Sequence, residues 1–288
     1  MGMGLPLVVC ALDRADLLDA GFSSAAPMPP YGGHVTSPIR EYTTISHPTP
    51  NTRVWHEIQG DGQPLVLLHG AFSGASSWGG QVPALVDAGW KVFCPERHGH
   101  GHSQDVTDEF HYADMAEETI AYLDEVVGGP AEIVGWSDGA VVGVLVALRR
   151  PDLVRHLVLI GQYYNSSGRA VGGILDALDS ADDELMEFFA ADYASESPDG
   201  QEHFQVVFDK TMAMINSEPE IDLGDLAAIT APTLVMQGDR DEVTLEHSRD
   251  VVAAIPGARL AVIPGTHLIP IEAPQAVNAI LVQFLGAE

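Results

Sequence analysis

The sequence predicts an α/β protein built on a mostly parallel, doubly wound sheet. Six short runs are apolar throughout instead of alternating, which is typical of strands buried on both faces of a parallel sheet. Stretches with helical periodicity separate these runs, and the alternation of strand and helix favours helices on both faces. The 288 residues, 46% of them hydrophobic, suffice for one large core with an insertion rather than for two full domains.

The elements follow each other regularly from about Arg53. The first predicted strand, 64–70, reads PLVLLHG and ends in glycine, and a helix is predicted after it over 78–89. The remaining strands are predicted over 90–96, 131–136, 157–161, 232–238 and 259–265. The remaining helices are predicted over 113–127, 138–150, 245–255 and 274–285.

Two regions depart from this rhythm. Residues 1–50 are rich in Pro, Gly, Ser and Ala, as in GFSSAAPMPPYGG, and we predict a partly disordered N-terminal extension there. Residues 162–225 contain no convincing strand, but two stretches carry Leu, Phe and Met at helical spacing. We therefore predict a helical cap over 162–225, inserted into a core formed by 51–161 and 226–288.

The charge balance is strongly acidic, with 41 Asp and Glu against 13 Lys and Arg and a formal net charge of −28. Such a surface repels nucleic-acid phosphates and anionic membranes, so we expect neither as a partner. The excess of acids is typical of a salt-adapted protein, or it steers cationic molecules towards the surface. The sequence does not indicate an oligomeric state.

Neither the cysteines nor the N-terminus indicates secretion. Cys94 lies in a predicted buried strand and Cys10 in the extension, so we expect no disulfide framework and no paired-cysteine metal site. The N-terminal run LPLVVCAL is short and follows no basic residue. It is weak as a signal peptide and too short to span a membrane, and we expect a cytoplasmic protein.

Three polar residues directly follow predicted strands: Ser137 in GWSDG, Asp241 in GDRD and His267 in GTH. Because α/β sheets bind ligands outside the carboxyl ends of their strands, these side chains are expected to meet there. A serine between two glycines is an ordinary turn residue, or a nucleophile on a strand-to-helix turn too tight for a Cβ. The chain order Ser, Asp, His favours the second interpretation.

Five motifs in chain order carry a family resemblance: HGAF at 69–72, GHGHS at 99–103, GWSDG at 135–139, GDRD at 238–241 and GTH at 265–267. Over roughly residues 53–288 the sequence resembles the serine hydrolases of the α/β-hydrolase fold family. Within that family, GWSDG and the position of the cap are similar to the biphenyl hydrolase-like, or valacyclovir hydrolase-like, esterases.

The resemblance implies catalysis by a serine nucleophile without a cofactor. Ser137 takes the place of the nucleophile, His267 that of the general base, and Asp241 that of the acid that orients the base. Asp241 is preferred because the family usually places this acid three residues after the glycine of the motif. Asp239 and Glu242 stay as alternatives.

The family pattern also implies an oxyanion hole, a pair of backbone N–H groups that bind the negative oxygen of the reaction intermediate. One donor is expected to be the N–H of Asp138, and the other that of Ala71 or Phe72, between which the sequence does not choose. The Asp138 side chain either attracts a substrate amine or makes local hydrogen bonds near a helix start, where an acid is favoured.

Four residues are candidates for binding the substrate, because they flank the nucleophile or lie in the predicted cap: Trp136, Tyr163, Phe188 and Met212. Core packing explains each of them equally well.

A histidine-rich loop is the main departure from the family pattern. Its members are His98, His100, His102 and His111. Such a cluster is compatible with a metal site, but we expect no metal. The family often has an acid, an arginine and then Gly-x-Gly-x-Ser here. Glu96 stands at the acid's place and His98 at the arginine's, and Arg97 is a candidate substitute. His69 is expected to be structural.

These observations lead to one functional expectation, a hydrolase of carboxylic esters, or of lactones or thioesters, that acts on a small-molecule ester substrate. The same residues support C–C bond hydrolysis, acyl transfer or perhydrolysis, because this fold hosts all of these reactions. A ligand receptor with a slow or vestigial catalytic triad is an alternative of another class.

Overall fold

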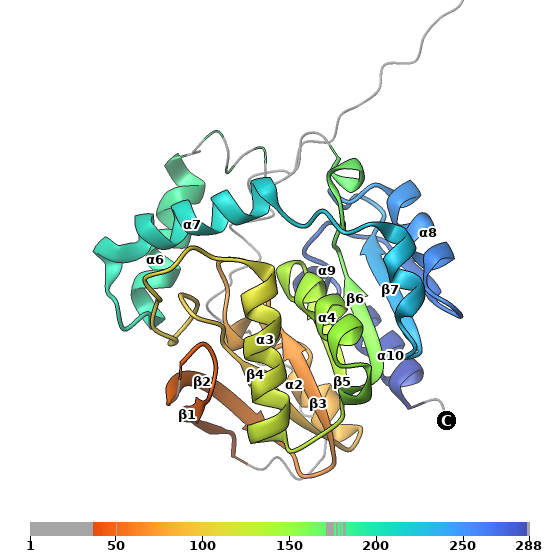
Figure 1. Cartoon of the computed structure of the whole chain (residues 1–288), viewed down its shortest axis with the longest axis horizontal. Coiled ribbons are helices and arrows are strands. Elements are labelled where there is room, and N and C mark those ends of the chain that lie inside the picture. The colour runs from red at the N-terminus through yellow and green to blue at the C-terminus, as the bar shows by residue number, and fades with distance from the viewer. Residues whose placement is uncertain are drawn as a thin grey trace, which may run out of the picture.

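The protein is described by a computed structural model that covers residues 37–49, 51–170, 176, 178, 180 and 183–286 (Figure 1). Residues 1–36, most of the predicted extension, lie outside the described residues. A central sheet is flanked by helices on both faces, so the predicted α/β class is confirmed.

The sheet has eight strands in the order β1-β2-β4-β3-β5-β6-β7-β8. The pairs β1–β2 and β2–β4 are antiparallel, and the remaining five pairs are parallel. The strands are β1 (Ile39–Ile45), β2 (Thr52–Gln59), β3 (Gln63–Leu68), β4 (Trp90–Pro95), β5 (Ala131–Trp136), β6 (Val154–Ile160), β7 (Thr233–Gly238) and β8 (Arg259–Ile263).

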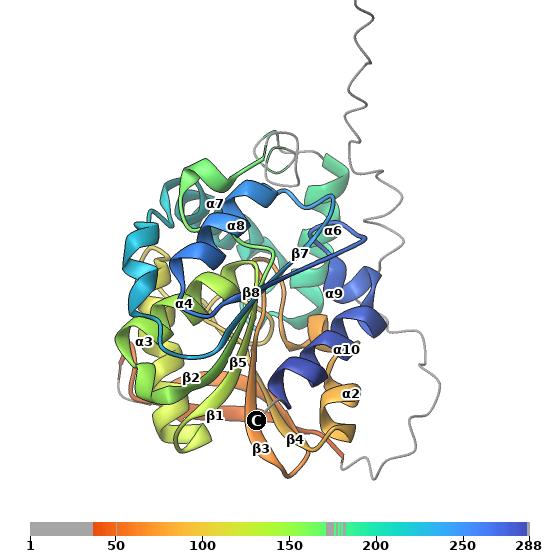
Figure 2. The same cartoon turned by 90° about the vertical axis from the view of Figure 1, so that its right-hand side faces the viewer.

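Helices cover both faces of the sheet, as Figure 2 shows nearly edge-on, with α3 and α4 on one side and α2 and α10 on the other. The α-helices are α2 (Val82–Asp87), α3 (Tyr112–Tyr122), α4 (Asp138–Arg149), α6 (Asp183–Glu196), α7 (Phe204–Ser217), α8 (Leu245–Ala254), α9 (Ile269–Glu272) and α10 (Pro274–Leu285).

Two apolar layers explain why the central strands are apolar throughout. In β3, Leu65 and Leu67 belong to the layer that includes α2 and α10, whereas Val66 and Leu68 belong to the layer that includes α3 and α4. Successive side chains of a strand point to opposite faces, so a strand covered on both sides needs an apolar residue at every position. The parallel part of the sheet is therefore held rigidly, and its carboxyl ends form a stable base for a site.

The sheet begins earlier than predicted. β1 lies within residues 1–50, which the sequence analysis assigned to the extension, and it pairs with β2 from Ile39↔Ile58 to Ile45↔Thr52. Five of its seven residues are exposed, because β1 is an edge strand with little apolar cover. β2 alternates between buried and partly exposed positions. Neither strand therefore has the continuous apolar run that reveals the others, and the boundary of the sheet moves from residue 51 to Ile39.

The regular elements in the described part of residues 162–225 are helices. Helices α6 and α7 lie beyond the carboxyl ends of the parallel strands (Figure 1). They share a separate apolar cluster that includes Phe189, Phe204 and Phe208, and Phe72 from the sheet domain packs against it. This cluster therefore couples the two helices to the loop that follows β3.

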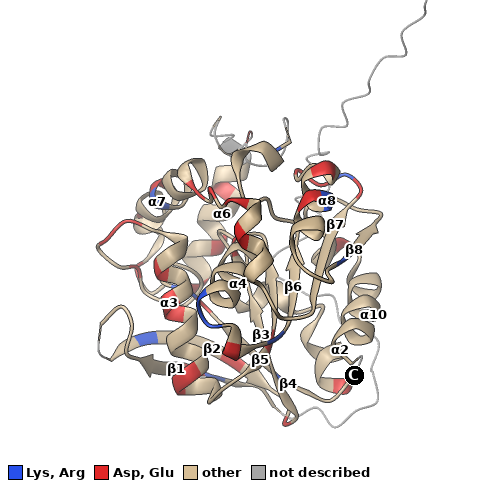
Figure 3. Ribbon diagram, turned by 45° about the vertical axis from the view of Figure 1, so that its right-hand side comes forward, with Lys and Arg blue, Asp and Glu red and all other residues tan. Residues whose placement is uncertain are grey.

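Asp and Glu residues occur along α3, α6, α7 and α8, with few Lys and Arg among them (Figure 3). The acidic residues of the described part are therefore distributed over several helices. In the part of the chain that the structure describes, no helix has the length and apolarity needed to cross a bilayer.

Candidate active site

Ser137 occupies a sharp turn between β5 and α4. Its backbone has φ 55° and ψ −122°, a region that residues other than glycine rarely adopt. A Cβ on Gly135 would overlap the backbone of Gly139, and one on Gly139 would overlap the carbonyl oxygen of Leu68. Both glycines of the motif are therefore required sterically, and the surrounding packing holds the serine in a strained conformation.

His267 follows β8, and its imidazole meets Asp241, which follows β7. The His267 Nδ1 lies 3.0 Å from Asp241 Oδ1 and 3.6 Å from Glu242 Oε1. The Asp241 carboxylate also accepts hydrogen bonds from the backbone N–H groups of Val243 at 3.2 Å and Gly238 at 3.4 Å. Asp241 is thus fully anchored, and Glu242 is a second carboxylate within reach of the ring.

Asp239, the other alternative in this motif, points elsewhere. Its Oδ1 accepts a hydrogen bond from the N–H of Gly265 at 3.0 Å, and its side chain is 54% exposed. Of the three acids that the sequence offered, the structure therefore brings Asp241 and Glu242 to His267 and turns Asp239 towards solvent.

The charge environment of His267 favours its protonated form. Burial alone would lower the pKa of the imidazole, but the charges of Asp241 and Glu242 and the hydrogen bond to Asp241 outweigh it and raise the pKa to about 9. The ring is therefore mostly protonated at neutral pH, and its capacity to accept a proton increases as the pH rises.

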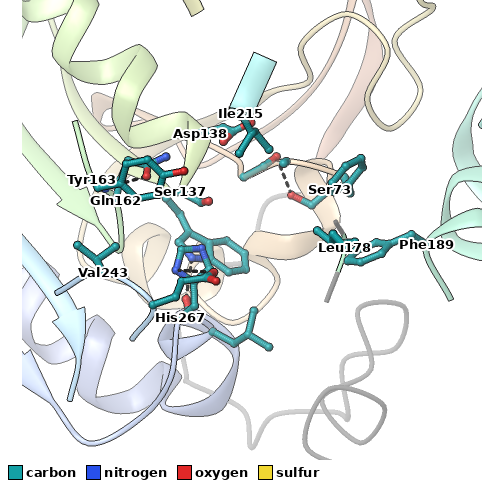
Figure 4. Close-up of a pocket in the computed structure, with 16 residues that line it drawn as sticks. Ser73, Ser137, Asp138, Gln162, Tyr163, Leu178, Phe189, Ile215, Val243 and His267 are labelled. Atoms are coloured by element: carbon teal, nitrogen blue, oxygen red, sulfur yellow. Dashed lines mark hydrogen bonds and ion pairs between the residues drawn. The ribbon is translucent and has the colours of Figure 1, made fainter. Parts of the chain in front are cut away.

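Ser137 and His267 line the same cavity, which has a volume of about 70 Å³ and lies where the strands end (Figure 4). Its walls come from the loop after β3, from the turn after β5 and from residues of the predicted cap. The lining residues are Gly70, Ala71, Phe72, Ser73, Trp136, Ser137, Asp138, Gln162, Tyr163, Leu178, Phe189, Ile215, Glu242, Val243, His267 and Leu268.

Two of the four predicted substrate-binding residues line the cavity, namely Trp136 and Tyr163. Phe188 and Met212 do not, and this part of the prediction is corrected. Phe188 packs edge-on against Phe189 with ring centroids 5.5 Å apart, and Met212 is buried in the cluster between α6 and α7. Each residue along a helix turns by about 100°, so the neighbouring Phe189 lines the cavity instead.

All three candidates for the oxyanion hole lie at the cavity: Ala71, Phe72 and Asp138. The loop that carries Ala71 runs close to the serine, since a Cβ on Gly70 would be 3.3 Å from the Ser137 Cβ. The Asp138 carboxylate is buried, and its Oδ1 accepts a hydrogen bond from the Tyr112 hydroxyl at 2.7 Å. One oxygen of this carboxylate is thus tied to α3, 26 residues away in the chain, while its buried Oδ2 has no hydrogen-bond partner among the described residues, so both interpretations of the Asp138 side chain stay open.

The histidine-rich loop is held by hydrogen bonds within the fold. Glu96 Oε1 accepts from the N–H of Ala75 at 2.9 Å, and Oε2 accepts from the N–H of His102 at 2.6 Å. Glu96 thus holds the loop to the segment after β3. His98 pairs with Glu118 on α3 instead of reaching the cavity.

Among the residues that the structure describes, one group of side chains could hold a metal ion. Glu96, His102 and Glu196 have possible ligand atoms within 4.8 Å of one another. His102 Nδ1 also lies 3.1 Å from Glu96 Oε2. Because hydrogen bonds already explain why Glu96 and His102 meet, these residues do not require an ion to account for their arrangement.

A mostly parallel sheet that presents a serine, a histidine and a carboxylate at its carboxyl edge is the arrangement of the α/β-hydrolase class. Residues 65–280 match the Alpha/beta hydrolase family, and the chain belongs to this family. The protein is a hydrolase of the α/β-hydrolase superfamily, and the fold expected from the five motifs is confirmed.

The chain is similar to several hydrolases over nearly their whole length. Pyrrolizixenacetamide deacetylase of Xenorhabdus hominickii is 27% identical over 264 residues, which are 83% of this chain and 96% of that protein. The esterase EaEST from Exiguobacterium antarcticum superposes with a TM-score of 0.70 at 22% identity, over 86% of this chain and 100% of that one. The enol-lactonase from Burkholderia xenovorans LB400 gives a TM-score of 0.69 at 21% identity, with the same coverage. At these identities the two structures show a shared fold.

Proposed function

We propose that the protein is a serine hydrolase that cleaves carboxylic esters of small molecules, with Ser137 as nucleophile, His267 as general base and Asp241 as the acid that orients the base. One observation carries the proposal: a serine held in a strained turn lines the same cavity as a histidine whose Nδ1 is fixed by a buried carboxylate. Strain of this kind persists where the surroundings over-determine it, and it gathers at functional sites.

The reaction follows from these positions. Because Asp241 occupies the Nδ1 side of the ring, Nε2 is the nitrogen left to take the proton from the Ser137 hydroxyl as its Oγ attacks the ester carbonyl. The C–O bond to the alcohol then breaks, the alcohol receives that proton, and an acyl group stays on Ser137. His267 next takes a proton from water as the water oxygen attacks the acyl carbon. The bond from that carbon to Ser137 Oγ then breaks, the Oγ takes the proton back from His267, and the acid leaves.

Backbone N–H groups stabilise the negative oxygen that forms in both steps. Asp138 supplies one donor from the start of α4, and the loop after β3 supplies the other. Removal of one such donor typically costs about 3–4 kcal/mol of transition-state stabilisation. The cavity walls beside the serine are mainly apolar residues such as Trp136, Leu178 and Ile215, which keep water from competing for the oxyanion.

Related acyl substrates belong in the test. The chain resembles a deacetylase that is named for an acetamide, and its fold matches that of an enol-lactonase. Lactones and thioesters react through the same acyl-enzyme, so they are included in the proposed substrate class. Amides, C–C bond substrates and peracid formation are the alternatives that a substrate panel separates.

The test is labelling with a fluorophosphonate, which reacts covalently with an activated serine, followed by hydrolysis of short and medium p-nitrophenyl esters. We expect labelling and turnover by the wild type, loss of both in Ser137→Ala, and wild-type behaviour of Ser167→Ala, which changes an exposed serine. A folded wild type that resists labelling would refute the proposal. Labelling with one slow turnover and retained product would favour the ligand receptor instead.

A further inference from the structure

A buried guanidinium lies behind the proposed oxyanion hole. Arg97, which follows β4, is 2% exposed and is the only Lys or Arg in the buried class among the residues that the structure describes. Its Nη2 donates a hydrogen bond to the carbonyl oxygen of Gly70 at 3.1 Å. A buried charge is costly unless it is well placed, so this contact requires a physical explanation.

The contacts of His69 define how this carbonyl is held. The backbone N–H of Arg97 donates to His69 Nε2 at 3.2 Å, so that Nε2 is the acceptor and Nδ1 carries the proton of the neutral ring. Burial, and after it the charge of Arg97, holds the pKa of His69 well below its usual value, in agreement with a neutral ring. The Nδ1–H therefore donates to the Gly70 carbonyl oxygen at 2.7 Å. Arg97 Nη2 lies 3.2 Å from this nitrogen, and in this tautomer that contact is not a hydrogen bond.

A third donor reaches the same oxygen, since the Ser73 hydroxyl lies 3.2 Å from it. One carbonyl thus accepts hydrogen bonds from a guanidinium, an imidazole and a hydroxyl. The peptide that carries the Gly70 carbonyl also carries the N–H of Ala71, which points the opposite way in a planar trans peptide. Donors on the carbonyl polarise the whole amide group, which makes its N–H a stronger donor.

The other half of the proposed hole also faces Arg97. Burial raises the pKa of the Asp138 carboxyl, while the charge of Arg97 is the largest influence that lowers it. Asp138, whose backbone N–H is the first proposed donor, therefore has its carboxylate within the electrostatic influence of the Arg97 guanidinium. His98, which stands at the place of the family's arginine, is paired with Glu118 and does not share this task.

We propose that Arg97 is a positioning residue of the oxyanion hole, which fixes and polarises the Gly70–Ala71 peptide so that the N–H of Ala71 is aimed into the cavity as the second donor. This inference rests on the proposed function of Ser137. It gives the cavity a buried positive charge behind the forming oxyanion, where Asp138 and Glu242 would otherwise make the surroundings unfavourable for negative charge.

The kinetic test compares Arg97→Met and Arg97→Lys with His100→Asn, which changes a buried ring of the same cluster without touching the Gly70 carbonyl. We expect Arg97→Met to lower kcat for p-nitrophenyl acetate by about ten- to thirtyfold with little change in KM, and Arg97→Lys to lower it less. The affinity for a trifluoromethyl ketone, which forms a tetrahedral adduct with the serine, should fall by the same factor. If Arg97 only stabilised the fold, the loss in kcat and the loss in affinity for the trifluoromethyl ketone would not agree.

A spectroscopic test does not depend on catalysis. In protein labelled with ¹³C-carbonyl glycine and ¹⁵N-alanine, the Gly70–Ala71 pair gives a resolved carbonyl–amide signal, which an Ala71→Ser variant assigns. We expect the carbonyl signal and the Ala71 amide proton signal to move upfield in Arg97→Met, to move partly in Arg97→Lys and Ser73→Ala, and to stay in place in His100→Asn. If Arg97→Met does not fold, the Lys and Ser73 variants carry the test.

Two results would overturn the proposal: unchanged kcat, inhibitor affinity and carbonyl shift in the folded Arg97 variants, or equal losses in His100→Asn. A wild-type protein that neither reacts with fluorophosphonate nor hydrolyses esters refutes the function of Ser137 instead. In that case the carbonyl shift still shows whether Arg97 holds the peptide, so the two failures are distinguishable.

Discussion

Glu242 provides the sharpest test of the electrostatics around His267. Its Oε1 lies 3.6 Å from His267 Nδ1, beside the Asp241 carboxylate at 3.0 Å. The neutral imidazole is the form that accepts the serine proton, so a carboxylate that favours the charged form shifts the activity to higher pH. Glu242→Gln removes that charge and keeps the shape, and it is therefore expected to lower the pKa of His267.

The size of the shift follows from the distance. Two unit charges 3.6 Å apart interact by about 1 kcal/mol in a water-like medium and by about 5 kcal/mol at an effective dielectric constant of about 20. One pKa unit corresponds to about 1.4 kcal/mol. Because the negative charge is spread over two oxygens, we expect a shift of about one unit downward from the wild-type pKa of about 9.

The assay is kcat/KM for a p-nitrophenyl ester from about pH 6 to 10, since this quantity reports the pKa values of the free enzyme. The wild-type profile should rise towards pH 9, and that of Glu242→Gln should rise at lower pH and exceed the wild type near neutrality. Asp239→Asn is the matched control, because this exposed carboxylate is bonded to Gly265 and not to His267. An unshifted Glu242→Gln profile, or equal shifts in both variants, would refute the reasoning.

Two further changes test the cavity and the turn. Phe189→Ala removes a ring that lines the cavity and packs on Phe72, with ring centroids 5.2 Å apart. The ratio of kcat/KM for octanoate esters to that for acetate esters should rise about tenfold. An unchanged ratio would contradict the position of Phe189 at the cavity. Gly139→Ala places a Cβ against the Leu68 carbonyl oxygen and should lower the free energy of unfolding by about 3 kcal/mol in urea titrations. Gly143→Ala in the same helix brings its Cβ to 3.3 Å from Leu157 Cδ1, a tight contact but with the end of a flexible side chain, and its free energy of unfolding should stay within about 1 kcal/mol of the wild type. Similar values for both variants would mean that the turn is less tight.

The sequence by itself determined the central sheet and the positions of the three proposed catalytic residues. Strands β3 to β8 each contain an apolar run that is visible in their own sequence. For β3 to β7, which lie inside the sheet, cover on both faces explains the run, whereas β8 is an edge strand with exposed residues. Ser137, Asp241 and His267 each lie within a few residues of the end of such a strand, so the rule that parallel strands end at one edge was enough to predict that they lie near one cavity. β1 is an edge strand with little apolar cover, and its neighbour β2 alternates between buried and partly exposed positions, so neither strand was predicted.

Only the tertiary structure decided which side chains face the cavity. Phe189 and Ile215 line it instead of Phe188 and Met212, because the rotation of α6 and α7 depends on their packing against each other and on the loop after β3. The hydrogen bond from Arg97 to the Gly70 carbonyl oxygen joins residues that lie 27 positions apart in the chain. Burial patterns and strand ends are local properties that a sequence records directly. The orientation of helices and loops arises from contacts between distant segments, and it exists only once the chain has folded.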